Sequence, residues 1–531
     1  MATTVTLPIL YRPAEDARSG LDLGFASGLI TLLTVIALAV HGYHPYAEDG
    51  GLYMAEIKRL LDPGLYPHGT EFVTGHLHFS LFAPMAAWVV RRSHMSLEMV
   101  LFLLYIASLW GTLCAGWLLA AQCYLRRELR AGAVALLAMW ITLPVAGTSL
   151  MLMDPYVTAR SLSTPCVLVA LAGVLEMFSQ DEPTAGMRWS GLVVCCVALF
   201  AAATIHPLMA AYGLGCVLVL VSVLSPVRQV RVWGTTGLCL IAVSIATIMQ
   251  ALAPPESATY LRVAMTRYYW FPGNWHLYEQ FGLAAPLIIL VIIGFRTSKG
   301  GEARIALARM ATICGAVAVI VAVLFARQDL ATHLVAKLQP LRIFQVVYVV
   351  MILIIGAALA ERVLQQRFWR WGTAFVLLAG VMLFAERQTF PHSTHLELPW
   401  RAPANSWEQA FVWISKNTPK DALFALDAHY ITTSGEDAQS FRAIAERSML
   451  PDYSKDGGEA SITPALTAAW TTGERAQTGL SVESDAQRVA VLRPLGVTWV
   501  VLGRSSRTNF PCIYKNDAVK VCRLPDVVHT K

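Results

Sequence analysis

Two sets of acidic side chains stand beside long apolar runs, where an unpartnered carboxylate is costly and is a candidate for chemistry. Glu48 and Asp49 are adjacent and follow the first apolar run, and Asp154 follows a later run after Met153. A positioned carboxylate can accept a proton in a reaction, so these residues are candidate general bases. The alternative is structural: each acidic residue caps the helix that follows it, with Arg160 as an ion-pair partner of Asp154.

The composition indicates that these residues belong to a membrane protein. Charged residues make up only 14% of the 531-residue chain, against about 25% in an ordinary soluble domain. Hydrophobic residues make up 56%, and the mean hydropathy is +0.53. We therefore predict a mainly α-helical, polytopic membrane protein. The net charge of +6 comes from short basic clusters between apolar runs, which indicate membrane topology rather than nucleic-acid binding.

Eleven apolar runs are long enough, or nearly long enough, to cross a bilayer. Several contain only 13 to 17 residues and need snorkelling ends or a locally thin bilayer to cross. The runs are 23–40, 97–122, 131–152, 161–177, 190–205, 208–224, 234–252, 283–295, 311–326, 341–359 and 371–385. We expect about eleven transmembrane helices.

Short basic clusters predict the orientation of these helices. All four clusters fall on one side if the eleven runs alternate, and the positive-inside rule makes that side the cytoplasm, together with the N-terminus. The clusters contain Arg126, Arg228, Lys299 and Arg362. The first external loop, 42–96, and everything after Glu386 are then predicted to lie outside the cytoplasmic (inner) membrane.

The run 77–90 decides whether the number of membrane crossings is odd, as this orientation requires. With 14 residues it is shorter than an ordinary span, so we expect a re-entrant or interfacial helix. The alternative is that it crosses the membrane and that one of the other short runs does not.

The last part of the chain differs in composition from the membrane domain, 1–390. From about residue 400 to 531 we predict a small soluble α/β domain outside the membrane. Apolar residues recur at helical spacing from Trp407 to Ile414, and Asn405 or Ser406 is the predicted cap. The predicted strands are 422–426, 497–502 and a hairpin over 512–524.

Cys512 and Cys522 are the only cysteines in this soluble domain. A three-residue loop at 516–518 sets them opposite each other, within reach of a disulfide. A two-residue turn at 516–517 would instead set Cys522 opposite Pro511. We predict the three-residue loop and the disulfide, on condition that the domain lies in an oxidising compartment.

The two acidic sites return to the same membrane face although they are about 100 residues apart. This arrangement resembles the GT-C superfamily of membrane glycosyltransferases, which carry an acidic motif in the first external loop, often a second acidic residue in the next external loop, and commonly a soluble C-terminal domain. The segments 413–424 and 496–502 also look like the tails of bacterial GT-C-like proteins.

The resemblance implies transfer of a sugar from a polyprenyl-phosphate donor in the membrane lipid to a glycan, lipid or protein acceptor. Asp49 would be the general base, and Glu48 or Asp154 would position the acceptor or hold a divalent metal, the one cofactor left open. Cations would stabilise the departing phosphate. The candidate cations are Lys58, Arg59, Arg160, Arg262, Arg267 and Arg342. For each of them the alternative is a snorkelling or headgroup-facing side chain.

The external stretch 267–278 has six aromatic residues in twelve positions. Aromatic faces stack on sugars, which makes Trp270 and Trp275 candidate substrate-binding residues. The alternative interpretation is an aromatic belt at the membrane interface.

Two other functions compete with the transferase. A transporter or flippase would place polar residues and broken helices at the membrane midplane, whereas the charges here cluster at the outer face. A non-catalytic GT-C-like scaffold would keep the fold without the chemistry. A shared site for Asp49 and Asp154 would favour the enzyme, because productive groups must meet.

Overall fold

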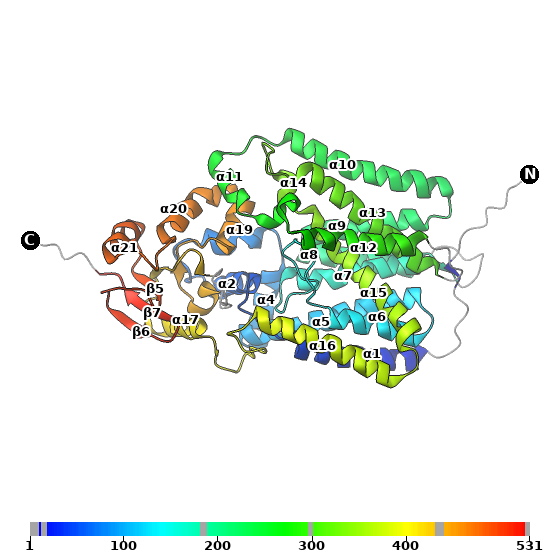
Figure 1. Ribbon diagram of the computed structural model, residues 1–531, viewed down its shortest axis with the longest axis horizontal. Coiled ribbons are helices and arrows are strands. Elements are labelled where there is room, and N and C mark those ends of the chain that lie inside the picture. The colour runs from blue at the N-terminus through cyan, green and yellow to red at the C-terminus, as the bar shows by residue number, and fades with distance from the viewer. Residues whose placement is uncertain (1–9, 12–18, 181–187, 296–300, 431–439, 526–531) are drawn as a thin grey trace, which may run out of the picture.

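The computed structural model describes residues 10–11, 19–180, 188–295, 301–430 and 440–525. Within these ranges the chain is mainly helical, and it has a five-stranded sheet near its C-terminus. A helical bundle forms one end of the molecule, and the sheet with its own helices forms the other (Figure 1). The predicted fold class, a polytopic helical membrane protein with a small C-terminal α/β domain, is confirmed.

Nine helices of the described residues are long and apolar enough to cross a membrane. They are α1 (Ser19–His41), α5 (Leu97–Cys123), α7 (Ala159–Met177), α9 (Pro207–Leu224), α10 (Thr235–Leu252), α12 (Leu277–Phe295), α13 (Glu302–Phe325), α15 (Phe344–Leu359) and α16 (Phe368–Thr389). Two further predicted runs form the shorter helices α8 (Trp189–Ile205) and α6 (Arg127–Met139), with 17 and 13 residues. Each of the eleven predicted runs therefore contains a helix.

Helix α6 ends well before its predicted run does. Pro144 has no amide hydrogen and cannot continue a helix, and it pairs with Met151 in an isolated antiparallel bridge. The chain between α6 and α7 therefore folds back on itself without helical structure. This non-helical segment carries Asp154.

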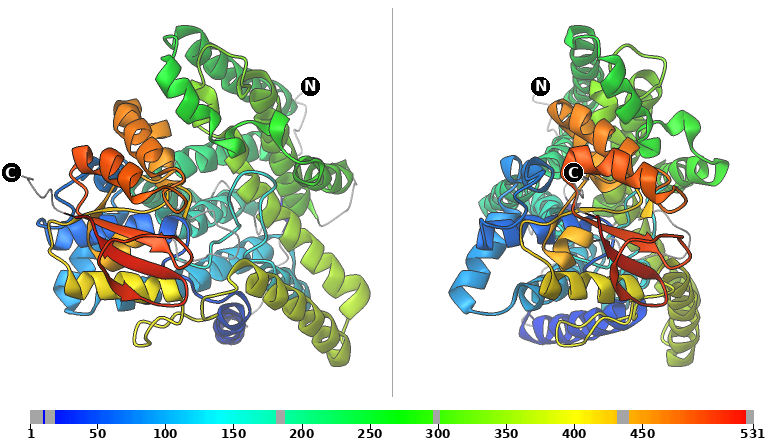
Figure 2. Two further views of the ribbon diagram at one scale, coloured as in Figure 1. Left: turned by 60° about the vertical axis from the view of Figure 1, so that its left-hand side comes forward. Right: turned by 90° about the vertical axis from the view of Figure 1, so that its left-hand side faces the viewer.

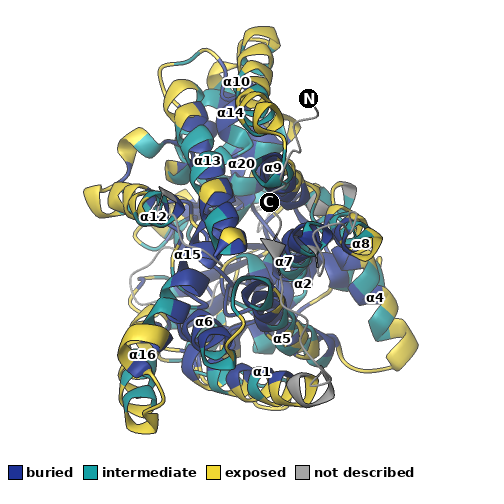
Figure 3. Ribbon diagram, turned by 90° about the vertical axis from the view of Figure 1, so that its right-hand side faces the viewer, coloured by how far each residue is buried: buried dark blue, intermediate teal, exposed yellow. Residues whose placement is uncertain are grey.

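The helices at the periphery of the bundle differ from those at its centre. Helices α10 and α16 expose apolar side chains such as Leu240, Ile248, Val376 and Phe384 along most of their length (Figure 3). Helix α15 is buried over nearly all of its length, against α6 and α13. This distribution is what a lipid solvent requires, since outward-facing side chains can be as apolar as the core.

The loop 42–96 folds into short helices at one end of the bundle. They are α2 (Asp49–Leu61), α3 (Glu71–Thr74), the 3₁₀ turn η1 (Gly75–His78) and α4 (Phe82–Ser93). Helix α4 overlaps the run 77–90, for which a re-entrant or interfacial helix was predicted. It buries Ala83, Ala86 and Ala87, while Trp88 is exposed. Its one-sided burial agrees with an interfacial position, which stays a prediction.

The chain between α10 and α12 also folds at this end. It contains α11 (Ala258–Met265) and the 3₁₀ turns η3 (Tyr268–Trp270) and η4 (Pro272–Asn274). The short helix α14 (Leu334–Lys337) and the turn η5 (Pro340–Ile343) precede α15.

The C-terminal domain, defined here as α17 to β7, covers this end of the bundle (Figure 2). Its elements are α17 (Ser406–Asn417), β3 (Leu423–Ala425), α18 (Phe441–Ala445), β4 (Ser448–Met449), α19 (Lys455–Ile462), α20 (Thr467–Gln477), α21 (Asp485–Leu492), β5 (Trp499–Gly503), β6 (Cys512–Lys515) and β7 (Val519–Arg523). The strand order is β4-β3-β5-β7-β6, with β6 and β7 antiparallel to their neighbours. The predicted cap is Asn405, which accepts a hydrogen bond from the Trp407 amide at 2.8 Å.

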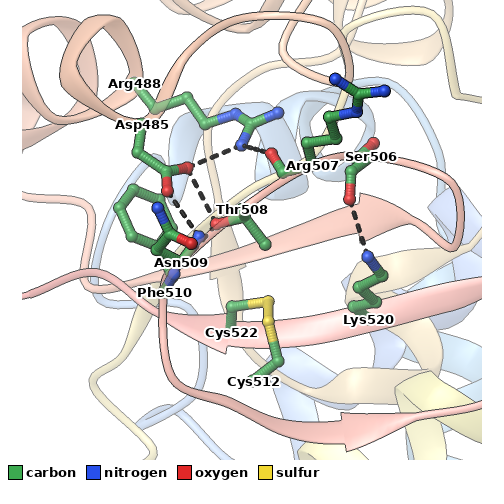
Figure 4. Close-up of a disulfide and its surroundings, with 10 residues drawn as sticks. All are labelled: Asp485, Arg488, Ser506, Arg507, Thr508, Asn509, Phe510, Cys512, Lys520 and Cys522. Carbon is green, nitrogen blue, oxygen red and sulfur yellow. Dashed lines mark hydrogen bonds and ion pairs between the residues drawn. A yellow bond between two sulfur atoms is a disulfide. The ribbon is translucent and has the colours of Figure 1, made fainter.

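The predicted cysteine pairing is correct, but the predicted loop is wrong. A disulfide joins Cys512 and Cys522 (Figure 4). The Asn516 amide donates to the Val519 carbonyl at 3.0 Å. The loop therefore contains two residues, Asp517 and Ala518, instead of the predicted three. A bulge at Ile513 restores the register and sets the cysteines opposite each other. The loop is shorter because the Asn516 side chain accepts from the amides of both residues that follow Asp517.

Candidate active site

The two predicted acidic sites meet at the C-terminal end of α1, where the chain leaves the bundle. The His44 amide donates a hydrogen bond to the Pro155 carbonyl at 2.7 Å, which joins the loop after α1 to the segment that carries Asp154. A Cβ atom at Gly50 would lie only 3.2 Å from the Tyr156 ring, so the start of α2 packs directly on this segment. The loops are therefore in contact, as a shared site requires.

Neither acidic site acts as a simple helix cap. Glu48 precedes α2 with a φ of 45°, a left-handed conformation that non-glycine residues rarely adopt, and its side chain makes no capping hydrogen bond. Helix α7 is capped by Thr158, with Ser161 completing a capping box. The part of the structural alternative that the structure retains is the ion pair between Asp154 and Arg160.

The pair of Asp154 and Arg160 is buried, with side-chain exposures of 5% and 6%. Burial raises the pKa of Asp154 above its usual range, the positive charge of Arg160 opposes this shift, and the negative charge of Asp49 adds to it. The electrostatic influence of Asp49 on Asp154 places both carboxylates in one electrostatic environment.

Arg342 joins this environment from the turn before α15. The charges of Asp49, Arg160 and Arg342 all act on the Tyr53 hydroxyl, which lies on α2, and burial raises the pKa of Tyr53 well above its usual value. The Arg342 Nε atom is buried without a hydrogen-bond partner in the described structure, beside a small cavity that Trp270 also lines. A buried guanidinium with an unused donor is suited to an anion such as phosphate.

Lys455, which the sequence analysis did not select, contacts both members of the first acidic site. Its ammonium group lies against Glu48 and is 3.1 Å from the Asp49 Oδ1 atom. The lysine side chain is 14% exposed, whereas those of Glu48 and Asp49 are 50% and 43% exposed. Burial alone would lower the pKa of Lys455, but the two carboxylates raise it above its usual value.

The site's ligand set does not match a metal centre. In the part of the chain that the structure describes, no group of three or more His, Cys, Asp or Glu side chains could hold a metal ion. A lysine ammonium lies between Glu48 and Asp49, where a shared cation would sit. We therefore derive no step of the reaction through a metal.

Three of the predicted phosphate-binding cations make contacts within the protein instead. Lys58 pairs with Glu446 at 2.9 Å and with Glu98 at 3.4 Å. Arg59 donates to backbone carbonyls of its own loop. Arg267 is buried and donates to carbonyls of the C-terminal domain.

The remaining predicted binding residues divide between the site and its surroundings. Arg160 and Arg342 lie with the carboxylates, whereas Arg262 is exposed on α11. Trp270 is buried beside Arg342, and the Trp275 ring packs against Gly147, where a Cβ atom would lie 2.4 Å away. The structure thus brings together Glu48, Asp49, Asp154, Arg160, Arg342 and Trp270, and it places the other predicted binding residues elsewhere.

Comparison with known proteins finds no matching family model and no matching curated sequence. Among solved structures, the chain is similar to the apo oligosaccharyltransferase of Archaeoglobus fulgidus, with 11% identity, a TM-score of 0.48, and coverage of 90% of this chain and 69% of that one. The mycobacterial arabinofuranosyltransferase AftD has 13% identity and a TM-score of 0.48 over 97% of this chain, which spans 42% of AftD.

A third similar structure is ArnT from Cupriavidus metallidurans bound to undecaprenyl phosphate, with 13% identity, a TM-score of 0.36, and coverage of 96% of this chain and 99% of ArnT. All three are membrane glycosyltransferases of the GT-C superfamily, the superfamily that the sequence resembles. Because each TM-score is below 0.5 and each identity is below 25%, these similarities assign no activity or substrate to this chain.

Proposed function

We propose that the protein is a membrane glycosyltransferase that moves a sugar from a polyprenyl-phosphate donor to an acceptor on the outer face of the cytoplasmic membrane. The observation that supports this proposal most strongly is the contact between the two acidic segments through His44 and Pro155. It brings two carboxylates and two arginines together at the end of a lipid-facing bundle, where a lipid-linked phosphate and a polar acceptor can both reach.

In this proposal Asp49 is the general base. Its side chain is partly exposed, so an acceptor hydroxyl group can approach it. Asp49 accepts the hydroxyl proton while the acceptor oxygen forms a bond to the anomeric carbon of the sugar. The bond from that carbon to the phosphate oxygen breaks, and the polyprenyl phosphate leaves with the electron pair.

Arg160 and Arg342 stabilise the departing phosphate. The guanidinium group of each is fixed in a buried environment, where its attraction for an anion is less screened than in water. The role of Asp154 is then to hold Arg160 in place through their buried ion pair, rather than to bind the acceptor directly.

The orientation of the chain follows from the basic clusters. The Arg127 guanidinium lies 6.0 Å from the centre of the Phe25 ring, near the start of α1, whereas Glu48 follows the end of α1. A helix of 23 residues spans about 34 Å at 1.5 Å per residue, so this cluster and the acid pair lie on opposite sides of a bilayer. With the positive-inside rule, this separation supports an orientation in which the site and the C-terminal domain lie outside the cytoplasm.

The experiment that tests the proposed activity compares a deletion strain with strains that carry the wild-type gene, Asp49→Asn or the control Glu71→Gln. Glu71 is an exposed carboxylate in the same external loop. We expect lipid-linked sugar to accumulate, and one surface glycan to be lost, in the deletion and Asp49→Asn strains only. Unchanged lipid-linked sugars and glycans in the deletion strain would contradict the proposal.

A further inference from the structure

The loop that presents Lys455 is fixed from within the C-terminal domain. The Arg442 guanidinium makes two hydrogen bonds to the Asp456 carboxylate, at 2.7 and 2.9 Å, and Asp456 in turn accepts from the Asp452 amide at 2.9 Å. The Trp470 indole donates to the Asp452 carbonyl at 2.7 Å. These groups are buried, so the segment from Asp452 to Asp456, which contains the start of α19, has little freedom to move.

The same loop is also held by the helical bundle. Arg267, which follows α11, donates to the carbonyls of Tyr453 and Ser454 at 2.9 and 2.7 Å. A Cβ atom at Gly457 would lie 2.8 Å from an Arg267 nitrogen, so the start of α19 packs closely against Arg267. Arg267 therefore fixes the two residues that precede Lys455.

Other contacts seat the whole domain on the first external loop. The Tyr66 hydroxyl donates to the Arg442 carbonyl at 2.9 Å, and Lys58 pairs with Glu446 at 2.9 Å. Gly51 of α2 lies directly against Ser440, where a Cβ atom would be 1.7 Å from the serine oxygen. The contact between Lys455 and the acid pair is thus one part of a large, closely packed interface.

The acid pair needs a counter-charge because adjacent carboxylates repel each other when both are ionised. Lys455 contacts both of them and comes from the C-terminal domain. It contacts one oxygen of Asp49 and leaves the side chain 43% exposed.

We propose that Lys455 is a positioning residue of the site: it offsets the repulsion between Glu48 and Asp49 and holds Asp49 ionised and correctly oriented. The C-terminal domain is then part of the catalytic site. The contact itself does not depend on the proposed function, but its role in the reaction rests on that function.

The contact is tested without any substrate by a water-soluble carbodiimide on the full-length protein in membranes. The reagent activates a carboxylate, and a lysine amine that touches it displaces the activating group to form an amide, with net loss of water. Proteolysis and mass spectrometry should find Lys455 joined to Glu48 or Asp49. Lys58 joined to Glu446 is the control for domain docking. Formation of the control link without any Lys455 link would overturn the proposal.

The role is tested with Lys455→Gln, Lys455→Arg and the control Lys58→Gln in complemented membranes. We expect Lys455→Gln to lower sugar transfer at least about tenfold, less than the loss of the base itself. Lys455→Arg should restore most of the transfer, because it returns a cation to the acid pair. Lys58→Gln removes an interdomain ion pair of the same helix and should keep nearly full transfer.

The outcomes separate the two proposals. Loss of transfer in Asp49→Asn together with wild-type transfer in Lys455→Gln overturns the role of Lys455 and keeps the proposed function. Wild-type transfer in Asp49→Asn overturns the assignment of Asp49 as the general base. Equal losses in Lys455→Gln and Lys58→Gln would show that only domain docking matters, which also overturns the positioning role.

Discussion

The main-chain amide of His44 donates to the carbonyl of Pro155 at 2.7 Å. This bond joins the loop after α1 to the loop before α7, and so places Asp49 and Asp154 on the same end of the bundle. The candidate base and the arginine that is proposed to bind phosphate thus lie on segments that are bonded to each other. The contact is made by backbone atoms, so it depends on the path of the chain rather than on either side chain.

The buried ion pair of Asp154 and Arg160 should be important for stability. Asp154→Asn leaves Arg160 buried without its partner, which typically costs about 3–5 kcal/mol. We expect a clear decrease in the melting temperature of the detergent-solubilised protein. Asp329→Asn is the matched control, because its pair with Arg327 is exposed and contributes little. Equal melting temperatures for Asp154→Asn and the wild type would contradict the importance of the pair.

Removing Arg267 should lower transfer although Arg267 does not contact the acid pair. Arg267→Gln frees the carbonyls of Tyr453 and Ser454, so Lys455 is no longer held in one position. We expect a severalfold loss of transfer in membranes. The control is Arg262→Gln, which changes an exposed arginine of α11 and should have no effect. A similar loss in both variants would contradict this role of Arg267.

The stability of the C-terminal domain should depend on pH through Asp452. Burial raises the pKa of Asp452 to about 7, and the charge of Asp456 adds to this shift. The folded protein therefore keeps a proton that the unfolded chain has already lost, and stability falls as the pH rises from about 4 to about 7. Asp452→Asn should remove this dependence and raise stability at neutral pH by on the order of 1 kcal/mol. Thermal unfolding at pH 5 and pH 7.5 measures both effects, and a wild-type pH dependence in the variant would contradict them.

The disulfide between Cys512 and Cys522 should be present in the cell if the C-terminal domain is outside. Under denaturing conditions without reductant, alkylation should label the eight cysteines outside the disulfide and leave this pair unlabelled. Reduction should expose the pair. The other eight cysteines are an internal control for the reagent, and full labelling of the pair before reduction would place the domain in a reducing compartment.

The orientation can be measured independently with reporters that are active on one side of the membrane only. A fusion after Arg401 should show external activity, and a fusion after Lys299 should show cytoplasmic activity. Cytoplasmic activity at Arg401 would mean that the number of membrane crossings before it is even.

Hydropathy was sufficient to predict the helical bundle. Each apolar run contains a helix because lipid can surround apolar side chains on every face but cannot form hydrogen bonds with the backbone. The backbone groups must therefore form hydrogen bonds within the segment. Hydropathy fails locally: α6 ends at Met139, and the non-helical chain beyond it, which includes Pro144, carries Asp154. A hydropathy window averages over such a break.

The acidic half of the site was also accessible from the sequence, but its basic partners were only partly so. Asp49 and Asp154 stand out because carboxylates are rare beside apolar runs. Lys455 does not stand out, since it lies 406 residues after Asp49 in a polar segment and meets it only through domain docking. Arg267 was predicted to bind phosphate, because the sequence does not reveal which backbone carbonyls a buried arginine will contact.

The most direct test of the central claim is the transfer rate of purified Asp49→Asn protein relative to the wild type, with membrane insertion and melting temperature measured on the same samples. The account predicts a loss of about 10²-fold or more, as for removal of a positioned general base, in a protein that stays folded and inserted. Transfer at the wild-type rate by this variant would contradict the assignment of Asp49 as the base.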